Sequence, residues 1–213
     1  MRRKATVGAC LLFLLSVLVL SAYTFREPIL TEAGRLLVVA NPVTSADVIV
    51  VSVDDRKAGV LDAADLFHQG VAPQVAVFVI PRDEVDIEYI RRGVPYFDMN
   101  AWYIKQLKSL GVTHVMLIPQ EVSGTEDEGN VLPAWLEQHR FRSVVIVTSS
   151  DHSRRVSRIL HRALKGQSVT LIVRPSRYSK FNPENWWQTR ENLRTGIVEL
   201  QKLFIDVVLH PIS

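Results

Sequence analysis

Side chains that can bind an anion follow one of the β-branched segments of the chain. Residues 148–155 read Thr-Ser-Ser-Asp-His-Ser-Arg-Arg and lead into a helical pattern. At 100° per residue, His152 and Arg155 lie on the apolar side of that helix, one turn before its buried residues. Both side chains are therefore expected to extend past the end of a sheet. Amides at a helix N-terminus attract negative charge. We expect Thr148, Ser149, His152 and Arg155 to bind an anion; the alternative is a capped helix with His152 packed on a loop.

Two further junctions place acidic side chains near the same edge. Glu128 lies one turn before the apolar stripe of a helix that begins at Thr125, so it points toward the crevice. Another strand ends in Ser52-Val53-Asp54-Asp55-Arg56. Carboxylates that face a histidine across a crevice suit acid–base catalysis. Glu128, Asp54 and His152 are therefore the candidate catalytic residues, with ordinary helix capping as the alternative for each acid.

Strand and helix patterns alternate along residues 46–213 and predict one α/β domain. We expect a Rossmann-like three-layer sandwich with a mostly parallel sheet, preceded by one transmembrane helix. In such sheets the ligand crevice lies beyond the carboxyl ends of the strands. The predicted strands are 47–53, 74–80, 114–118, 142–148 and 169–173, and the predicted helices are 56–69, 100–110, 125–139, 152–165 and 190–209.

The N-terminus predicts a membrane anchor. Residues 5–25 form a run of twenty-one residues without a charge, which spans about 30 Å as a helix and so matches a hydrocarbon core. Arg2, Arg3 and Lys4 precede it and predict a cytoplasmic N-terminus, with the remaining domain on the far side. A cleaved signal peptide with Ser21-Ala22 near the cut is the alternative. Residues 1–25 are thus expected as tip and anchor, 26–45 as a tether, and 46–213 as the domain.

Composition limits the classes of function. Of the 213 residues, 47% are hydrophobic and 22% charged, and the net charge of +3 does not indicate a nucleic-acid partner. The single cysteine, Cys10, lies in the apolar run, so the domain has no disulfide framework. Phosphate-loop, GxGxxG and GxSxG motifs are absent from the sequence, as is any His/Cys set with metal-ligand spacing. We expect no metal, and no cofactor is indicated.

Several of these segments together resemble the YdcF/SanA-like family of bacterial envelope proteins. The resemblance covers residues 36–203 and rests on Ala46–Val51, Ala63–Leu66 with Gly70, Thr125 with Glu128, Thr148-Ser149 with His152 and Arg155, and Trp187, Arg190, Glu199 and Lys202. It implies a Rossmann-like domain behind a membrane helix, located at the bacterial inner membrane with the domain extracytoplasmic. It also implies a role in peptidoglycan and envelope maintenance, and adds Trp187 and Arg190 to the expected ligand-binding residues.

The chain departs from the family pattern at its first two strand ends. Ser52-Val53-Asp54-Asp55 replaces a glycine-rich turn, Gly59 stands where an arginine is usual, and Ile80-Pro81-Arg82 replaces Ser-Gly-Gly. Arg56 lies one turn before the apolar positions of its helix and is the substitute we expect for the missing cation. With Ser52 and Thr125, it completes the set of expected ligand-binding residues.

Three hypotheses follow for the function. The leading one is a membrane-anchored protein of envelope biogenesis that binds an anionic, phosphate-bearing or lipid-linked ligand; the sequence leaves open whether it acts on that ligand as an enzyme. The second is a non-catalytic interaction module, which the altered strand ends favour. The third is a nucleotide-binding enzyme on a Rossmann-like sheet.

Overall fold

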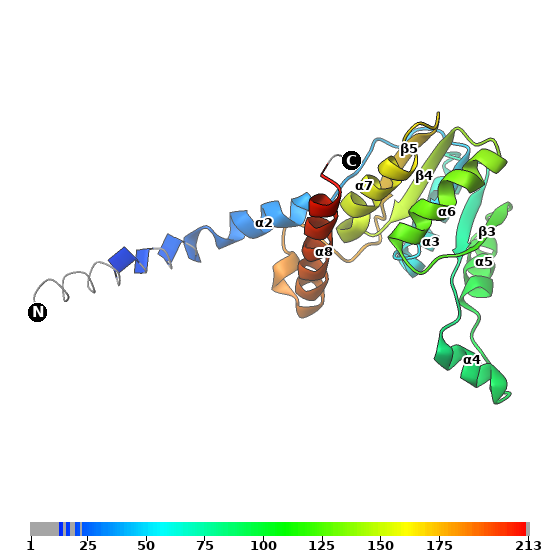
Figure 1. Ribbon diagram of the computed structural model, residues 1–213, viewed down its shortest axis with the longest axis horizontal. Coiled ribbons are helices and arrows are strands. Elements are labelled where there is room, and N and C mark those ends of the chain that lie inside the picture. Colours follow the sequence, from blue (N-terminus) through cyan, green and yellow to red (C-terminus); the bar gives the residue numbers. More distant parts are fainter. Residues whose placement is uncertain (1–12, 15, 18–19, 22, 212–213) are drawn as a thin grey trace, which may run out of the picture.

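The β-branched runs of the chain form a five-stranded sheet in the order β3-β2-β1-β4-β5 (Figure 1). The computed structural model describes residues 13–14, 16–17, 20–21 and 23–211. All four neighbouring pairs are parallel, and Val50 lies opposite both Ala76 and Ile146. The strands are β1 (Val48–Val51), β2 (Val75–Val79), β3 (Val115–Glu121), β4 (Ser143–Thr148) and β5 (Thr170–Pro175). Each predicted strand is confirmed, and the sheet is parallel throughout.

Helices cover both faces of the sheet. Alternate strand residues point to opposite faces, so Ile49 and Val51 pack under α3 and α5, whereas Val48 and Val50 pack under α6 and α7. This arrangement confirms the expected α/β class with three layers. The helices are α2 (Arg26–Leu36), α3 (Arg56–His68), α4 (Glu84–Arg91), α5 (Met99–Ser109), α6 (Thr125–Gln138), α7 (Ser153–Ala163) and α8 (Arg190–Leu209), with short 3-10 helices η1 (Ser150–His152) and η2 (Trp186–Gln188).

The segment expected as a tether is a helix that docks on the domain. Residues 26–36 form α2, and Leu37 is 1% exposed. Gly34 allows α2 to approach Pro183 and Trp186, because a Cβ atom there would lie 2.6 Å from the Pro183 carbonyl oxygen. The Trp186 indole also donates to the Leu30 carbonyl at 2.7 Å. Pro28 indicated a tether, but it lies in the first turn of α2, where a proline is tolerated because its missing N–H has no helical partner.

The expected membrane span lies mostly outside the described residues, since 1–12, 15, 18–19 and 22 are not described. Among the residues that are described, no helix is long and apolar enough to cross a bilayer. The anchor and the side of the membrane on which the domain lies therefore stay predictions.

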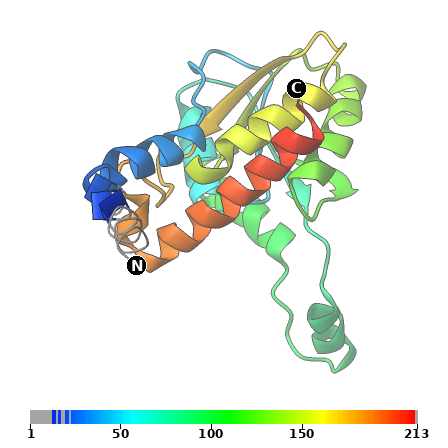
Figure 2. The ribbon, with the colours of Figure 1, turned by 60° about the vertical axis from the view of Figure 1, so that its left-hand side comes forward.

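An arm between β2 and α5 was not predicted (Figure 2). It comprises residues 81–98 and carries α4, which has no buried residue. Asp83 begins α4 with a capping box, since it accepts from the Asp86 amide at 2.8 Å and Asp86 accepts from its amide in return. At the base of the arm, Asn100 bonds both the amide and the carbonyl of Ile80. These bonds fix the arm where it leaves the sheet.

A third apolar cluster, in addition to the clusters on the two faces of the sheet, joins α2 and α8 to the domain. Leu37, Phe181 and Trp186 form its buried centre, with residues of α2 and α8 packed around them. Gly196 of α8 is essential to this packing, because a Cβ atom there would lie directly against the Trp186 ring.

We expect Gly196→Ala to lower the free energy of unfolding by about 1–3 kcal/mol, because overpacking a rigid buried indole costs more than helix propensity returns. Chemical denaturation of the full chain in detergent measures the change. Gln201→Ala, on the exposed side of the same helix, is the matched control and should change stability by less than about 0.5 kcal/mol. Equal stability of Gly196→Ala and the wild type would contradict this account of the cluster.

Candidate functional site

A polar crevice lies where the strand order reverses. β2 and β4 lie on opposite sides of β1, and such a switch point leaves room for a ligand beyond the carboxyl ends of the strands. The crevice has a volume of about 450 Å³, within the range of small-molecule sites. Its lining comes from the ends of β1 and β4, the start of α3, the connection after β5 and the start of α8. The lining residues are Asp54, Asp55, Lys57, Ala58, Ser149, Asp151, Tyr178, Ser179, Lys180, Phe181, Glu191, Asn192 and Thr195.

Beside the crevice, one buried carboxylate holds three cationic side chains. Glu199 of α8 is 1% exposed. Its Oε2 lies 2.7 Å from His152 Nδ1 and 3.0 Å from Arg155 Nε, and its Oε1 lies 2.7 Å from Lys202 Nζ. A buried charge needs such compensation because it has lost its hydration. Glu199 therefore joins α8 to the start of α7.

The pKa values of this group follow from the pairing. Burial opposes ionisation of Glu199, but the hydrogen bond and charge of His152, the bond from Lys202 and the charge of Arg155 lower its pKa to about 2. Burial also opposes protonation of His152, but the bond to Glu199 and the charges of Asp151, Asp54 and Glu199 raise the pKa of His152. The protein thus favours an imidazolium–carboxylate pair.

Arg155 extends this network to the end of β1. Its terminal nitrogen lies 3.6 Å from Asp54 Oδ2, and the hydroxyl of Thr125, the first residue of α6, donates to the same oxygen at 3.0 Å. Residues far apart in the sequence thus converge on Asp54, which lines the crevice. The predicted proximity of Asp54, Thr125, His152 and Arg155 is what the structure shows.

Glu128 has a structural position. It is 1% exposed and does not line the crevice. Its Oε1 accepts from the Ser52 hydroxyl at 2.8 Å and from the Val53 amide at 2.7 Å, which ties the end of β1 to α6. Burial raises the pKa of Glu128 to about 7, although both of these bonds favour the ionised form. Its Oε2 has no hydrogen-bond partner among the described residues.

Asp55 is an acid of the crevice whose pKa is strongly raised. Burial raises it to about 8, and the neighbouring charges of Asp62 and Asp151 act in the same direction. Asp55 is 5% exposed, and one of its oxygens has no hydrogen-bond partner in the described part of the chain. A carboxyl group in this position holds its proton at neutral pH, so it has the properties of a general acid.

The N-terminus of α7, which we expected to bind an anion, is partly bonded within the protein. The Arg154 amide donates to the Leu37 carbonyl at 2.9 Å, and the Ser153 hydroxyl accepts from the Val39 amide at 2.8 Å. The chain after α2 therefore takes up part of the hydrogen-bonding capacity of this helix end. His152 and Arg155 are also already paired with Glu199, so an added anion would have to compete with a buried carboxylate.

The other expected ligand-binding residues are dispersed. Ser149 lines the crevice, whereas Thr148 is fully buried behind it. Trp187 packs edge-on against Trp186 in the third apolar cluster. Arg190 is exposed at the start of α8 and does not line the crevice. The side chain of Arg56 lies outside the described residues.

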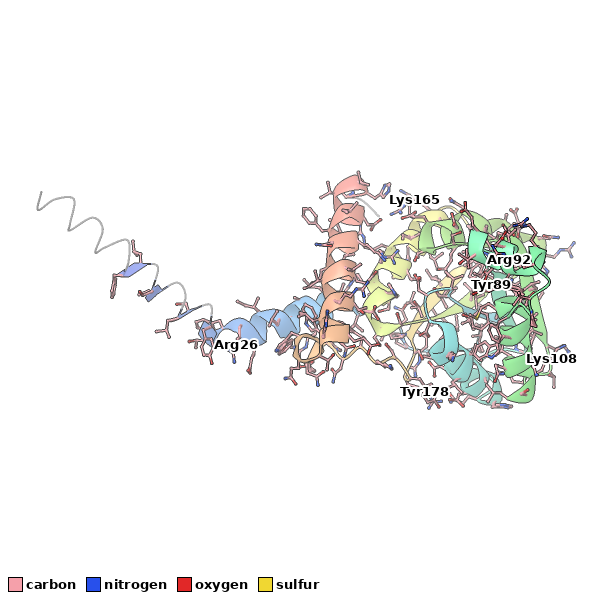
Figure 3. The ribbon with its side chains drawn as sticks, turned by 90° about the horizontal axis from the view of Figure 1, so that it is seen from below. Arg26, Tyr89, Arg92, Lys108, Lys165 and Tyr178 are labelled. Atoms are coloured by element: carbon pink, nitrogen blue, oxygen red, sulfur yellow. The ribbon has the colours of Figure 1, made fainter. Side chains whose placement is uncertain are left out.

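Sequence reasoning missed several residues that line the crevice or hold it together. Asp55, Asp151 and Glu199 were not among the candidate site residues, although all three acids are buried, with at most 5% of each exposed. Lys57 was not predicted, because no motif in the surrounding sequence marks it as a binding residue. Tyr178, labelled in Figure 3, donates to Asp65 of α3 at 2.7 Å and so fixes the connection after β5.

The part of the chain that the structure describes contains no group of three or more His, Cys, Asp or Glu residues placed to hold a metal ion. No family model matches the chain, and no curated protein matches it. Among solved structures, the crystal structure of a universal stress protein in complex with cAMP is similar, with a TM-score of 0.38 and 15% sequence identity over 62% of this chain and 99% of that one.

We expect Glu199→Gln to lower the free energy of unfolding by about 3 kcal/mol, because it leaves buried cations without their partner. The pKa of His152 should fall, since the charge that raises it is removed; NMR titration of the His152 ring measures this. Glu191→Gln, an exposed acid on the same helix, is the control and should change neither quantity appreciably. An unchanged His152 pKa in Glu199→Gln would contradict the pairing.

Asp55 should make the protein less stable as pH rises. The unfolded chain releases this proton near pH 4, but the folded chain holds it to about pH 8, so the native state binds more protons between these values and its stability falls with rising pH. Asp55→Asn should flatten this slope and add stability at pH 7, on the order of 2 kcal/mol. Denaturation between pH 5 and 8, with Glu137→Gln as the exposed control, measures it; an equally steep slope in Asp55→Asn would refute the assignment.

Proposed function

We propose that the protein is anchored in the bacterial inner membrane and acts outside the cytoplasm in envelope biogenesis. In this proposal the crevice binds the sugar-phosphate headgroup of a lipid-linked precursor. The anchor rests on the uncharged run of residues 5–25, and the envelope role on the resemblance to YdcF/SanA-like proteins. The observation that carries the choice of ligand is the lining of the crevice, which combines carboxyl groups, hydroxyl groups and two lysines.

The acidic floor favours a ligand rich in hydroxyl groups. Asp54 and Asp151 line the crevice together with the polar side chains of Ser149, Asn192 and Thr195. Carboxylates accept hydrogen bonds from sugar hydroxyls but repel a phosphate. The saccharide of the headgroup is therefore the part that suits the floor, and Phe181 offers an apolar wall for its ring.

The cations at the rim suit the phosphate. Lys57 lies in the first turn of α3, a turn without acidic residues, so its ammonium group and the helix dipole act together on an anion. Lys180 lies across the crevice, 81% exposed, with only a 3.7 Å contact to Glu191. A phosphate that binds Lys57 and Lys180 would displace Glu191 from its contact with Lys180.

Asp55 gives the crevice a proton to donate. In the proposed reaction the oxygen of a water molecule attacks the phosphorus of the headgroup and forms a P–O bond, while the Asp54 or Asp151 carboxylate takes a proton from that water. The P–O bond to the leaving group breaks, and Asp55 gives its proton to the leaving oxygen. Arg155 and His152 act as positioning residues, because they bind Glu199 and hold Asp54 in place.

Binding of N-acetylglucosamine 1-phosphate tests the proposal, since this molecule carries the headgroup chemistry without lipid. We expect it to raise the unfolding temperature of the full chain in detergent in a concentration-dependent way. Lys57→Gln should weaken binding at least tenfold, because it removes a charge-assisted contact. Asp55→Asn should still bind, since the proton of Asp55 serves the chemical step.

Lys165→Gln is the matched control, because Lys165 is an exposed cation at the far end of α7 (Figure 3). It should bind as the wild type does. Absence of binding by the wild type, or equal affinity of Lys57→Gln and Lys165→Gln, would contradict the proposed ligand. Normal envelope function of Lys57→Gln and Asp55→Asn in cells would favour the second hypothesis, a non-catalytic interaction module. The exposed apolar side chains of α4 offer a surface for such an interaction.

A further inference from the structure

The polar and apolar sides of α8 are the reverse of those of an ordinary surface helix. Its inward side is acidic, because Glu199 binds His152 and Arg155 and Asp206 binds Arg158 at 2.6 Å. Its outward side is apolar in the C-terminal half, where Phe204 is 69%, Val208 60% and Leu209 67% exposed. A helix on the surface of a water-soluble domain normally shows the opposite arrangement. The outward side of α8 therefore favours contact with an apolar environment.

The outward side follows helical spacing along the whole of α8. Arg190, Arg194, Ile197, Phe204 and Val208 recur at intervals of three, four and seven residues and therefore lie on one face. We call these five residues the outer face of α8. The acidic residues of the helix lie elsewhere: Glu191 lines the crevice, and Glu199 and Asp206 face α7. Apolar residues combined with arginines and without acids are typical of helices that lie in the interface of an anionic bilayer.

The position of α8 relative to the N-terminal segment indicates what contacts its outer face. Figures 1 and 3 show α8 crossing the direction of α2, on the side of the body from which the N-terminal helix leaves. Leu30 and Ala33 of α2 pack in the same cluster as Leu200 and Leu203 of α8. The two helices are thus joined through Trp186 and its neighbours, shortly after the predicted anchor ends.

The cluster that joins the two helices lies near the predicted headgroup layer. Leu30 and Ala33 follow Phe25, the last residue of the uncharged run, by about 8 and 12 Å at 1.5 Å per residue. The headgroup layer is about 5–8 Å thick on each side. Because Leu200 and Leu203 pack on the same cluster, α8 runs close to that layer.

We propose that the outer face of α8 lies in the headgroup layer of the bilayer to which the chain is anchored. This inference rests on the membrane anchor of the proposed function, but not on the ligand of the crevice. It gives the domain a second attachment to the membrane and so fixes its orientation: a single anchoring helix would let the body rotate, whereas α8 holds one side of it against the lipid.

Spin labels on the full chain in vesicles of phosphatidylethanolamine and phosphatidylglycerol test this orientation. Phe204→Cys and Val208→Cys, each made in a Cys10→Ser background, carry the label on the outer face; Leu61→Cys, a partly exposed position on α3, is the matched control. We expect the ratio of oxygen to nickel-chelate collisions to be at least threefold higher at positions 204 and 208 than at 61, because lipid dissolves oxygen and excludes the chelate.

Equal ratios at the three positions would overturn the proposal, since the outer face would then contact water. Labels at 204 and 208 that neither reagent reaches would overturn it as well, because they would indicate a protein partner such as a second copy of the chain. Binding of N-acetylglucosamine 1-phosphate by the same variants should be unchanged. Loss of the lipid signature with ligand binding retained would therefore reject the α8 inference alone, and failure of the chain to stay with the vesicles would reject the anchor.

Discussion

The Glu199 carboxylate is the contact on which the arrangement of this protein depends. It lies on the last helix, yet it binds the histidine and the arginine at the start of α7. Through Arg155 it also reaches Asp54 at the end of β1. α8 is therefore attached to the body by charge pairs on its inward side. Leu200 and Leu203 also pack inward on the cluster around Trp186, whereas Phe204, Val208 and Leu209, near the pair of Asp206 with Arg158, remain exposed on the outward side.

A second buried acid fixes the opposite wall of the crevice. Glu128 holds the turn after β1 through Ser52 and Val53, and the neighbouring Thr125 bonds Asp54. Asp54 is thus positioned from two sides, by α6 and by α7. This support is built from hydrogen bonds that need no ligand, so the crevice is organised before anything binds. The Ser52 hydroxyl, the Val53 amide and the Asp54 carboxylate of this turn make these bonds.

Most of the sheet and the helices that cover it could be predicted from the sequence. Their signals are local: β-branched runs such as 48–51 and 144–147 form strands, and Gly70, Gly111 and Gly166 adopt positive φ after helices. α2 was missed because Pro28 signals a break as readily as a first helical turn. The role of Glu199 was missed because its partners are more than forty residues away, and spacing within one helix reports only neighbours on that helix.

The same limit explains why the sequence predicted the proximity of the site residues but not their surroundings. The convergence of three strand ends follows from topology, so Asp54, Thr125, His152 and Arg155 were placed together correctly. Which of them face a ligand depends on what else fills the space, and that is decided by distant segments such as residues 37–39 and α8.

The apolar cluster around Trp186 connects α2 to the wall of the crevice. Phe181 lines the crevice and at the same time packs with Leu37 and Trp186, and Trp186 bonds the backbone of α2. A change in the angle of α2 would therefore move Phe181 directly, without passing through the sheet. If α8 holds that angle against the lipid, the crevice presents a constant opening to headgroups, and the apolar cluster around Trp186 is then the element that translates membrane attachment into the shape of the site.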